Sequence, residues 1–370
     1  MDIQDKRIAI LSPVAWRTPP RAYGAWETVA SNITEGLVAR GWKNVTLFAT
    51  KDSVTKARLV GFIERGYEED RSQIGLVSMC LHISKTLERA GEFDLIHNNF
   101  DYLPLTYLPF IKTPMLTTIH GFSHPDILRV YRNYKDTYYV SISDSDRDPE
   151  LPYVATVYNG IDLSNLTFRE QPGDKLLFLG RIHPDKGPHW AIEVAKRSGR
   201  DLIISGIIQD QQYFDNFIRP HLNESSIQYV GPADPIQRDE LFRQAYVTLH
   251  LNTIPERFGL VMAESMAAGV PVIAMDLGSC REVVKDKETG FLVRTIDDAV
   301  EAVGKVDRID RRNCRRHVEE NFSIARMAER YERVYEEIFR REAAKGRSGR
   351  TPTNTDEHGP ARTWAPETCP

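Results

Sequence analysis

The sequence predicts an α/β protein with two consecutive domains, each built around a doubly wound parallel sheet. Short β-branched segments alternate with segments of helical periodicity along most of the chain, a pattern typical of βαβ units. The alternation restarts after a Pro- and Gly-containing stretch at residues 171–174. The length of 370 residues fits two domains of about 150 residues each. Because ligands bind beyond the carboxyl ends of the strands in such sheets, we expect the two sheets to face a shared cleft.

The first half of the chain contains the elements of the first predicted sheet. Apolar residues at helical spacing predict a helix at residues 27–40, which ends at Gly41, a residue typical of helix ends. The other predicted elements are a helix at 74–90 and strands at 8–12, 45–49, 95–97, 115–120 and 138–142.

The second half repeats the alternation and then becomes helical. Strands are predicted at 176–179, 202–205, 227–230, 247–251 and 272–275, and helices at 190–197, 213–222, 239–244 and 260–268. Residues 308–341 are helical and charged. Residues 343–370 are rich in Gly, Pro, Thr, Ser and Arg, which predicts a disordered tail of native or engineered origin.

Composition excludes several functional classes. The chain carries 48 Lys and Arg against 52 Asp and Glu, a net charge of −4, which argues against a nucleic-acid-binding protein. No segment reaches the ~18 consecutive apolar residues of a membrane span. The four cysteines are scattered without metal-ligand spacing, which favours a reducing cytosol over a disulfide framework: Cys80, Cys280, Cys314 and Cys369.

The basic residues near the C-terminus are interleaved with acids. A solvated helix face is the expected role of this segment, and weak contact of a cytoplasmic protein with a membrane surface is the alternative. The residues concerned are Arg311, Arg312, Arg315, Arg316, Arg340 and Arg341.

A basic turn follows the predicted strand at 176–179. Arg181 and Lys186 lie five residues apart on the loop that leads from Gly180 to a helix beginning near Pro188. Two cations beside a helix N-terminus suit a diphosphate, because the helix supplies amide donors and the side chains supply charge. A solvated loop is the alternative, since so short a motif has low specificity.

Two glutamates lie at the start of the predicted helix at 260–268. Glu256 lies in the loop before this helix, and Glu264 lies about two turns inside it. The amides of Phe258, Gly259 and Leu260 would lie at the helix N-terminus, where anions and sugar hydroxyls bind. Because carboxylates accept hydrogen bonds from pairs of hydroxyls, this arrangement suits a sugar nucleotide. An ordinary exposed helix residue is the alternative for Glu264.

The stretch from Glu256 to Glu264 is similar to the Glu-x7-Glu signature of glycosyltransferase family 4, the retaining, nucleotide-sugar-dependent transferases with the GT-B fold. The resemblance covers residues 6–340, and the joint order of its motifs is specific although each motif alone is modest. The other motifs, in chain order, are Arg21-Ala-Tyr23-Gly24, Asp94-Leu-Ile-His97, Thr118-Ile-His120-Gly121, Tyr158-Asn159-Gly160-Ile161-Asp162, Phe178-Leu-Gly180-Arg181 with Lys186-Gly187, Glu282-Val-Val and Thr289-Gly290-Phe-Leu-Val.

The resemblance implies how a donor would be bound. Arg181 and Lys186 would hold the donor diphosphate, and Glu264 would accept hydrogen bonds from the ribose hydroxyls. Gly24 would let the chain approach the phosphates closely, because glycine lacks a Cβ atom.

The resemblance also implies which residues act on the sugar. Glu256 would contact the transferred sugar beside the amides of Phe258, Gly259 and Leu260. His120 would lie near the reacting sugar from the first domain. Glu256 and His120 are therefore the predicted catalytic residues.

The implied architecture is GT-B, with two Rossmann-like domains facing a central cleft. The N-terminal, acceptor-side domain would comprise residues 1–165, and the nucleotide-sugar-binding domain would comprise residues 166–324. Residues 325–342 would form a helix that returns to the N-terminal domain, followed by the tail at 343–370.

The implied activity is transfer of a hexosyl unit from a UDP- or GDP-sugar to an acceptor, with retention of anomeric configuration. No readable motif identifies the acceptor, whether carbohydrate, lipid or small molecule, or the oligomeric state. The alternatives are a sugar-nucleotide epimerase or hydrolase of the same fold, or a catalytically silent sugar-nucleotide-binding subunit. A nicotinamide oxidoreductase is disfavoured, because Gly24 is followed by Ala-Trp-Glu and the first turn lacks GxGxxG.

No cofactor or metal is expected. The motif Asp144-Ser145-Asp146 is the competing observation, because an Asp-x-Asp pair holds a metal on the donor diphosphate in the other large transferase fold. These acids directly follow a predicted strand, where they suit a turn or a helix N-cap. Arg181 and Lys186 already offer positive charge to a diphosphate.

Two further residues carry alternative interpretations. His97 ends a predicted strand, and we expect it to be structural or cleft-lining and not catalytic. Arg257 occupies a position where similar transferases often have a small residue or Pro, which predicts either altered sugar selectivity or a cap on its own loop.

Overall fold

The strands form two groups along the chain in the computed structural model, which describes residues 3–122, 124–223 and 225–348. The first group comprises β1 (Arg7–Leu11), β2 (Asn44–Phe48), β3 (Arg58–Val60), β4 (Leu95–Asn98), β5 (Met115–Ile119), β6 (Tyr138–Ser141) and β7 (Tyr153–Thr156). The second group comprises β8 (Lys175–Leu179), β9 (Leu202–Ser205), β10 (Ile227–Tyr229), β11 (Ala245–His250), β12 (Val272–Met275) and β13 (Gly290–Val293).

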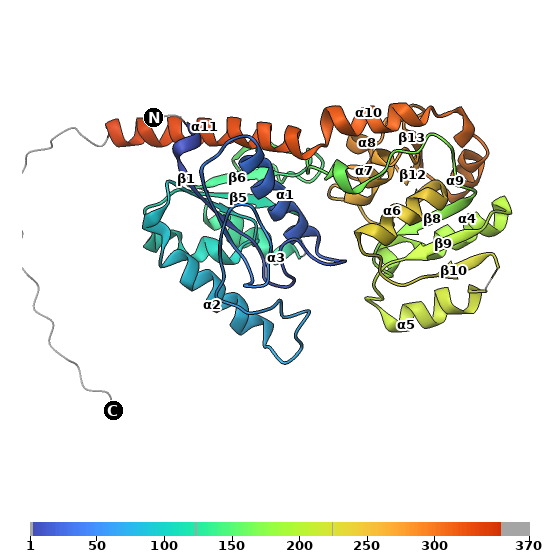
Figure 1. The fold of residues 1–370 in the computed structure, drawn as a ribbon, viewed down its shortest axis with the longest axis horizontal. Helices are drawn as coiled ribbons and strands as arrows, with labels where there is room; N and C mark the ends of the chain where they lie inside the picture. The colour runs from blue at the N-terminus through green and yellow to red at the C-terminus, as the bar shows by residue number, and fades with distance from the viewer. Residues whose placement is uncertain (1–2, 123, 224, 349–370) are drawn as a thin grey trace, which may run out of the picture.

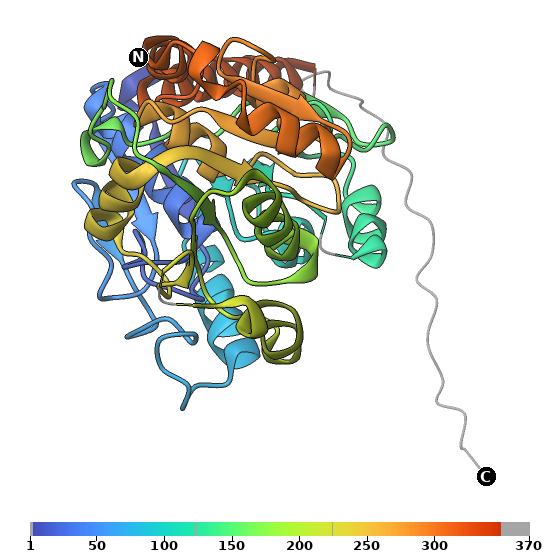
Figure 2. The same ribbon diagram turned by 90° about the vertical axis from the view of Figure 1, so that its right-hand side faces the viewer.

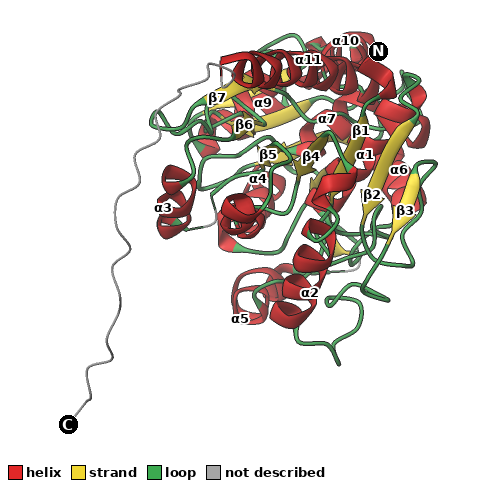
Figure 3. Ribbon diagram, turned by 90° about the vertical axis from the view of Figure 1, so that its left-hand side faces the viewer, coloured by secondary structure: helices red, strands yellow, loops and turns green. Residues whose placement is uncertain are grey.

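Each group forms one parallel sheet. The first sheet has seven strands in the order β3-β2-β1-β4-β5-β6-β7, which can be followed in Figure 3. The second has six strands in the order β10-β9-β8-β11-β12-β13. In both sheets the first strand in sequence lies inside the sheet, and later strands extend it in both directions, so both sheets are doubly wound.

The helices cover the sheets in separate domains, one to each side of Figure 1. Figure 2, with the second domain facing the viewer, shows its helices packed around the second sheet. The first domain has α1 (Ala25–Ala39), α2 (Gly75–Leu87) and α3 (Pro125–Asn133); the second has α4 (Pro188–Ser198), α5 (Gln211–Tyr213), α6 (Pro235–Gln244), α7 (Leu260–Ala267), α8 (Cys280–Val283), α9 (Ile296–Val303) and α10 (Arg311–Asn321).

The strand sequences explain why these sheets are buried on both faces. Four of the five residues of β1, and all six of β11, are buried, a near-continuous apolar pattern typical of parallel sheets. In the first domain, Ile8 and Ile10 join one core cluster, whereas Ala9 and Leu11 join another. Because successive side chains of a strand point to opposite faces, the first sheet has a core on each side.

The last helix, α11 (Ile324–Ser348), joins the two domains. It follows α10 of the second domain directly and runs along the first domain, where it packs on α1 (Figure 1). A Cβ atom at Gly36 of α1 would lie 2.9 Å from the Cβ of Ala328, so glycine allows this close approach. Tyr335 of α11 is buried and its hydroxyl lies 2.7 Å from Nδ1 of His97. His97 is therefore structural, as expected.

The structure corrects the predicted start of the tail. Helix α11 continues to Ser348, six residues beyond the predicted end at 342. The added turn contains two alanines, which favour helix, and Lys345 pairs with Glu342 at 2.8 Å. The rest of the predicted disordered tail, residues 349–370, lies outside the described residues.

Several element predictions also differ from the structure. The short edge strands β3 and β7 and the helix α3 were not predicted. Helix α6 begins at Pro235 and not at 239, because Asp234 and Gln237 form a reciprocal capping box. The predicted regular helix at 213–222 is wrong: a π-helix at Phe214–Ile218 is followed by a 3-10 turn at Arg219–His221, where Pro220 lacks the amide that an α-helix requires.

Candidate functional site

The predicted site residues gather at the carboxyl ends of strands near the centre of each sheet. Gly24 lies between β1 and α1, and His120 directly follows β5. Arg181 follows β8, and Glu256 lies between β11 and α7. β1 and β8 are the strands from which each sheet extends in both directions, and ligands of such sheets bind at this switch point.

Glu256 is a buried carboxylate held by three side-chain donors. Its Oε2 atom lies 2.6 Å from Lys186 Nζ, 2.9 Å from His250 Nε2 and 2.6 Å from Asn252 Nδ2. Its Oε1 atom accepts the amide of Arg257 at 3.0 Å. Burial raises the pKa of Glu256, but the hydrogen bond from His250 and the charge of Lys186 outweigh it and hold that pKa well below its usual range. Glu256 is therefore ionised at neutral pH.

The backbone around Glu256 is fixed by two glycines with positive φ. Gly278 (φ +58°) runs so close that an added Cβ would lie 2.3 Å from the Glu256 carbonyl oxygen, and the amide of Ser279 donates to that oxygen at 3.0 Å. Gly259 (φ +79°) would place a Cβ 2.4 Å from Met262 Cε. Neither site accepts a larger residue without moving the loop that carries Glu256.

The backbone amides that were predicted to bind a ligand lie at the N-terminus of α7. Gly259 is the N-cap of this helix and gives it no side-chain cap, so the first amides of α7, beginning with Leu260, are available to a ligand. The side chain of Phe258 is buried, with its ring 5.7 Å from that of Phe322. Phe258 therefore anchors the loop in the core while its backbone borders the site.

The basic turn after β8 lies beside Glu256. Lys186 ends the 3-10 turn Pro184–Lys186, and Gly187 (φ +69°) starts α4; an added Cβ there would lie 2.0 Å from the Leu251 carbonyl oxygen. This contact presses the turn against the end of β11. Arg181 is held by a hydrogen bond from its Nη1 atom to Gln209 Oε1.

Glu264 connects the second domain to the first through an arginine. Its Oε1 atom lies 2.6 Å from Arg238 Nη1, and the same guanidinium donates to the carbonyl oxygen of Ala22 at 3.1 Å. The Glu264 side chain is 12% exposed, so it is neither an ordinary surface residue nor fully shielded. A bound ligand could still reach its second oxygen.

The loop that contains Gly24 approaches the basic turn. Tyr23 interacts electrostatically with both Arg181 and Glu256, and burial raises its pKa. Gly24 has a φ of +147° and is the N-cap of α1, where an added Cβ would lie 3.0 Å from Pro20 Cβ. Residues of the first domain thus reach the predicted diphosphate turn of the second.

His120 is a buried, neutral imidazole. Its Nε2 atom lies 3.2 Å from Asn99 Oδ1, and its ring stacks on Trp26 with a centroid distance of 5.5 Å. Burial lowers the pKa of His120 to about 3. Because Asn99 Oδ1 is an acceptor, Nε2 carries the hydrogen, and Nδ1 of the neutral ring is an acceptor for a hydroxyl.

Glu27, in the first turn of α1, is a buried acid next to Gly24. Its Oε1 atom accepts the amide of Trp16 at 3.2 Å, and burial raises its pKa to about 7. The folded protein therefore binds a proton at Glu27 more tightly than the unfolded chain does. The resulting penalty is absent below the ordinary pKa of a glutamate and is complete above pH 7.

Replacing Glu27 by Gln should therefore stabilise the protein more at high pH than at low pH. We expect the gain in the free energy of unfolding to be about 2 kcal/mol larger at pH 8 than at pH 5. Urea unfolding of both proteins at the two pH values measures it. An equal effect at both values would contradict a buried acid with a raised pKa.

Arg257 crosses to the first domain and does not cap its own loop, so that predicted alternative is wrong. Its Nη1 atom pairs with Asp146 Oδ1, and its Nη2 atom donates to the carbonyl oxygen of Phe122 at 3.1 Å. An added Cβ at Gly121 (φ +127°) would lie 2.9 Å from Arg257 Cγ. Arg257 thus brings the loop of Glu256 against the residue that follows His120.

The Asp-x-Asp motif is used by the protein itself. Asp146 is buried and paired with Arg257, and Asp144 Oδ1 accepts the hydroxyl of Thr156. The amide of Asp144 donates to Glu282 Oε2 at 2.8 Å, a further contact between the domains. Across residues 3–122, 124–223 and 225–348, no group of three or more His, Cys, Asp or Glu side chains is placed to hold a metal ion.

The predicted basic face near the C-terminus is largely paired. Arg311 is buried and donates to the carbonyl oxygens of Gly269 and Tyr246 at 3.1 and 2.7 Å. Arg315 pairs with Glu319 at 2.6 Å. The prediction of a solvated face is therefore wrong for Arg311, whereas Arg340 and Arg341 are exposed and pair with Glu337, as expected.

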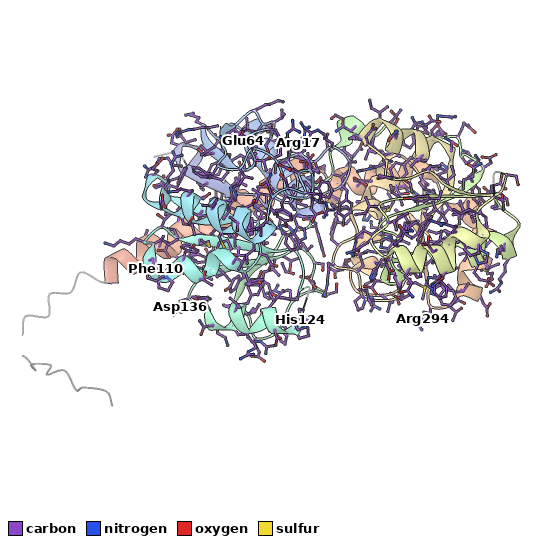
Figure 4. All side chains as sticks on the ribbon, turned by 90° about the horizontal axis from the view of Figure 1, so that it is seen from below. Arg17, Glu64, Phe110, His124, Asp136 and Arg294 are labelled. Atoms are coloured by element: carbon purple, nitrogen blue, oxygen red, sulfur yellow. The ribbon has the colours of Figure 1, made fainter. Side chains whose placement is uncertain are left out.

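The side chains of both domains form two bodies that meet across a narrow zone in Figure 4, where Arg294 marks the second domain and Phe110 the first. Phe110 is 83% exposed on the first domain. The contacts of Arg238 and Arg257 with first-domain residues hold the domains together across this zone.

A comparison with protein families concerns the second domain. Residues 167–321 match the family model described as glycosyl transferases group 1. The second domain is a group 1 glycosyltransferase domain. The basic turn, Glu256 and Glu264 all lie within the matched residues, so the predicted resemblance to glycosyltransferases is confirmed.

Curated relatives of the group 1 domain include transferases with different acceptors. The chain is 27% identical over 237 residues to phosphatidyl-myo-inositol mannosyltransferase of Mycobacterium leprae, which covers 56% of this chain and 62% of the relative. It is 31% identical over 151 residues to glycogen synthase of Mycobacterium tuberculosis, covering 38% of this chain and 36% of the relative. The chain therefore spans less than two thirds of the length of these relatives.

Solved structures resemble nearly the whole chain. A structure of Anabaena Alr3699/HepE in complex with UDP and glucose matches 90% of this chain and 100% of that chain, with a TM-score of 0.69 and 18% sequence identity. At this identity the likeness concerns the fold. Together with the two parallel sheets, it confirms the predicted GT-B fold around the group 1 domain.

Sequence reasoning missed several residues of the site. His250, Asn252 and Arg238 contact Glu256 or Glu264, and none of them was singled out. A signal for the first two was present, because polar residues at the end of a buried strand lie at the ligand-binding edge of a parallel sheet. No sequence signal indicated Arg238, whose position depends on how α6 packs beside α7.

Proposed function

We propose that this protein is a retaining glycosyltransferase that moves a hexosyl unit from a UDP- or GDP-sugar to an acceptor hydroxyl. The observation that carries the proposal is the part-buried Lys186–Glu256 pair on the loops that follow β8 and β11, with Arg181 on the same loop as Lys186. The two cations suit the charge of a diphosphate, and the carboxylate of Glu256 suits hydrogen bonds from sugar hydroxyls. The group 1 domain and the UDP bound in the HepE structure support the same donor class.

The leaving diphosphate would be neutralised by the basic turn. When the bond between the sugar C1 atom and the phosphate oxygen breaks, its electron pair goes to that oxygen. Arg181 and Lys186, on the turn before α4, offer charge and hydrogen bonds to it. The acceptor oxygen bonds to C1 on the same face, and its proton goes to the departing phosphate oxygen.

His120 and Glu256 would act on the sugar from opposite domains. The neutral His120 offers Nδ1 to a hydroxyl, and ionised Glu256 stabilises positive charge that develops on the sugar ring. Glu256 already has three side-chain donors on one oxygen. That crowding supports electrostatic stabilisation over covalent attack by this carboxylate, in keeping with same-face transfer.

A panel of UDP- and GDP-sugars tests the proposed function. A donor at 100 times its dissociation constant adds about 2.7 kcal/mol of stability, which a thermal shift detects. The binding donor is then incubated with carbohydrate, lipid and small-molecule acceptors, and the anomeric configuration of the product is determined by NMR. A new sugar nucleotide would indicate an epimerase, free sugar alone a hydrolase, and binding without turnover a silent subunit.

Transfer is expected to proceed without a divalent metal. The donor charge has cationic partners in Arg181 and Lys186, and Asp146 is occupied by Arg257. We expect activity in excess EDTA to remain within about twofold of the untreated enzyme, because the two cations neutralise the donor diphosphate without a metal ion. Loss of activity in EDTA that Mn²⁺ or Mg²⁺ restores, and that Asp144→Ala/Asp146→Ala reproduces, would contradict this.

We propose a cytoplasmic location on the basis of the thiols. Cys80, Cys280 and Cys314 are all free in the part of the chain that the structure describes, which suits a reducing compartment. Among those same residues, none of the helices has the length and apolarity to cross a bilayer.

A further inference from the structure

The hydrogen-bonding capacity of the Glu256 Oε2 atom is fully used by the protein. An ionised carboxylate offers about four acceptor positions. Three donors meet on Oε2, from Lys186, His250 and Asn252, and the amide of Arg257 meets Oε1. A sugar hydroxyl can therefore bind to Oε2 of Glu256 only if one of these three side-chain donors leaves.

Lys186 is the donor that can leave. It lies on a turn, its side chain is 20% exposed, and its ammonium group sits on a flexible four-carbon stem. His250 ends β11 and is buried, and Asn252 follows it and is also buried. Short, buried side chains at the end of a central strand have no second position to adopt. The Arg257 amide belongs to the backbone that Gly278 fixes.

Asn252, which donates to Glu256, has a side-chain oxygen that no group in the described part of the protein uses. Its Nδ2 atom donates to Glu256, which fixes the orientation of the amide. Its Oδ1 atom is buried and has no hydrogen-bond partner within the described chain. Buried polar atoms are rarely left without a partner, so Asn252 Oδ1 is an acceptor available to a hydroxyl beside Glu256.

We propose that His250 and Asn252 are positioning residues of the donor site, which hold the Glu256 carboxylate while Lys186 moves from Glu256 to the donor diphosphate. The acceptor position that Lys186 vacates on Glu256, and Asn252 Oδ1, then take hydroxyls of the transferred sugar. The inference rests on the proposed function and adds to it an exchange of partners at Lys186.

Binding of UDP and GDP tests the exchange without any turnover. In the wild type, diphosphate binding must break the Lys186–Glu256 pair. In Glu256→Gln this pair is already weakened, so calorimetry should show the preferred nucleotide binding about threefold or more tightly than to the wild type. Unchanged or weaker binding to Glu256→Gln would overturn the exchange, and so would a wild type that binds neither nucleotide.

Turnover of the donor tests the positioning residues. His250→Phe removes the donor to Glu256 at similar size, and we expect it to lower kcat about tenfold or more with little change in nucleotide affinity. His250→Gln can still donate from its amide and should restore much of the loss. A purely structural role would instead lower stability in both variants and leave kcat per folded molecule unchanged, which would overturn the proposal.

A matched histidine controls for lost packing. His317 is also buried in the second domain, where its Nε2 atom lies 3.0 Å from the carbonyl oxygen of Val283 instead of contacting Glu256. His317→Phe should keep kcat, and an equal loss in both histidine variants would count against a specific role for His250. If Glu256→Gln binds the nucleotide more tightly than the wild type does, but the wild type transfers no sugar, the proposed function fails while the exchange at Lys186 stands.

Discussion

Lys186→Ala is expected to reduce transfer by about 30- to 1000-fold, equivalent to a loss of about 2–4 kcal/mol of transition-state stabilisation. The variant removes the cation that pairs with Glu256 in the structure and that the diphosphate would attract during the reaction. It also leaves Glu256 buried without its charge partner, although His250 and Asn252 still donate to it. Initial rates at saturating donor measure the effect.

Two controls distinguish a specific effect of the Lys186 charge on the reaction from a general loss of charge or of stability. Lys196 lies on α4, which follows the basic turn, and its exposed side chain contacts His221. Lys196→Ala should retain wild-type rates. Circular dichroism must show that Lys186→Ala remains folded. A folded Lys186→Ala enzyme with undiminished turnover would exclude Lys186 from the reaction.

Glu264→Gln is expected to weaken nucleoside diphosphate binding by about 10- to 100-fold, the range for losing a hydrogen bond to a charged group. The ribose occurs in both the nucleotide and the nucleotide sugar, so both ligands should bind more weakly. The substitution also leaves Arg238 without the carboxylate that lies 2.6 Å from its Nη1 atom. Calorimetry with UDP and GDP measures the loss.

Glu256→Gln should behave in the opposite way toward the nucleotide. Because Glu256 pairs with Lys186 and would contact the sugar, its loss should tighten nucleoside diphosphate binding and damage transfer. Glu301→Gln serves as the control, since Glu301, on α9, makes a surface pair with Lys305. Equal loss of nucleotide affinity in Glu256→Gln and Glu264→Gln would show that the two glutamates do not divide the donor between them.

The sequence by itself determined the fold class and most of the donor turn. Strand and helix periodicity are local properties, so the alternation along the chain predicted two parallel sheets. Arg181, Lys186 and Glu256 were found because short spacings place them at strand ends, where parallel sheets bind ligands. The edge strands β3 and β7 were missed, because three or four partly buried residues carry little periodic signal.

Only the tertiary structure decided which partners these residues have. Arg257 lies one residue from Glu256, yet its ion-pair partner is Asp146, 111 residues away in the other domain. Arg238 reaches Glu264 and Ala22 for the same reason: packing, not local spacing, brings α6, α7 and the Gly24 loop together. The saturation of Glu256 likewise depends on side chains from β8–α4 and β11 converging on one buried oxygen. Such convergence follows from the strand order, which local periodicity does not encode.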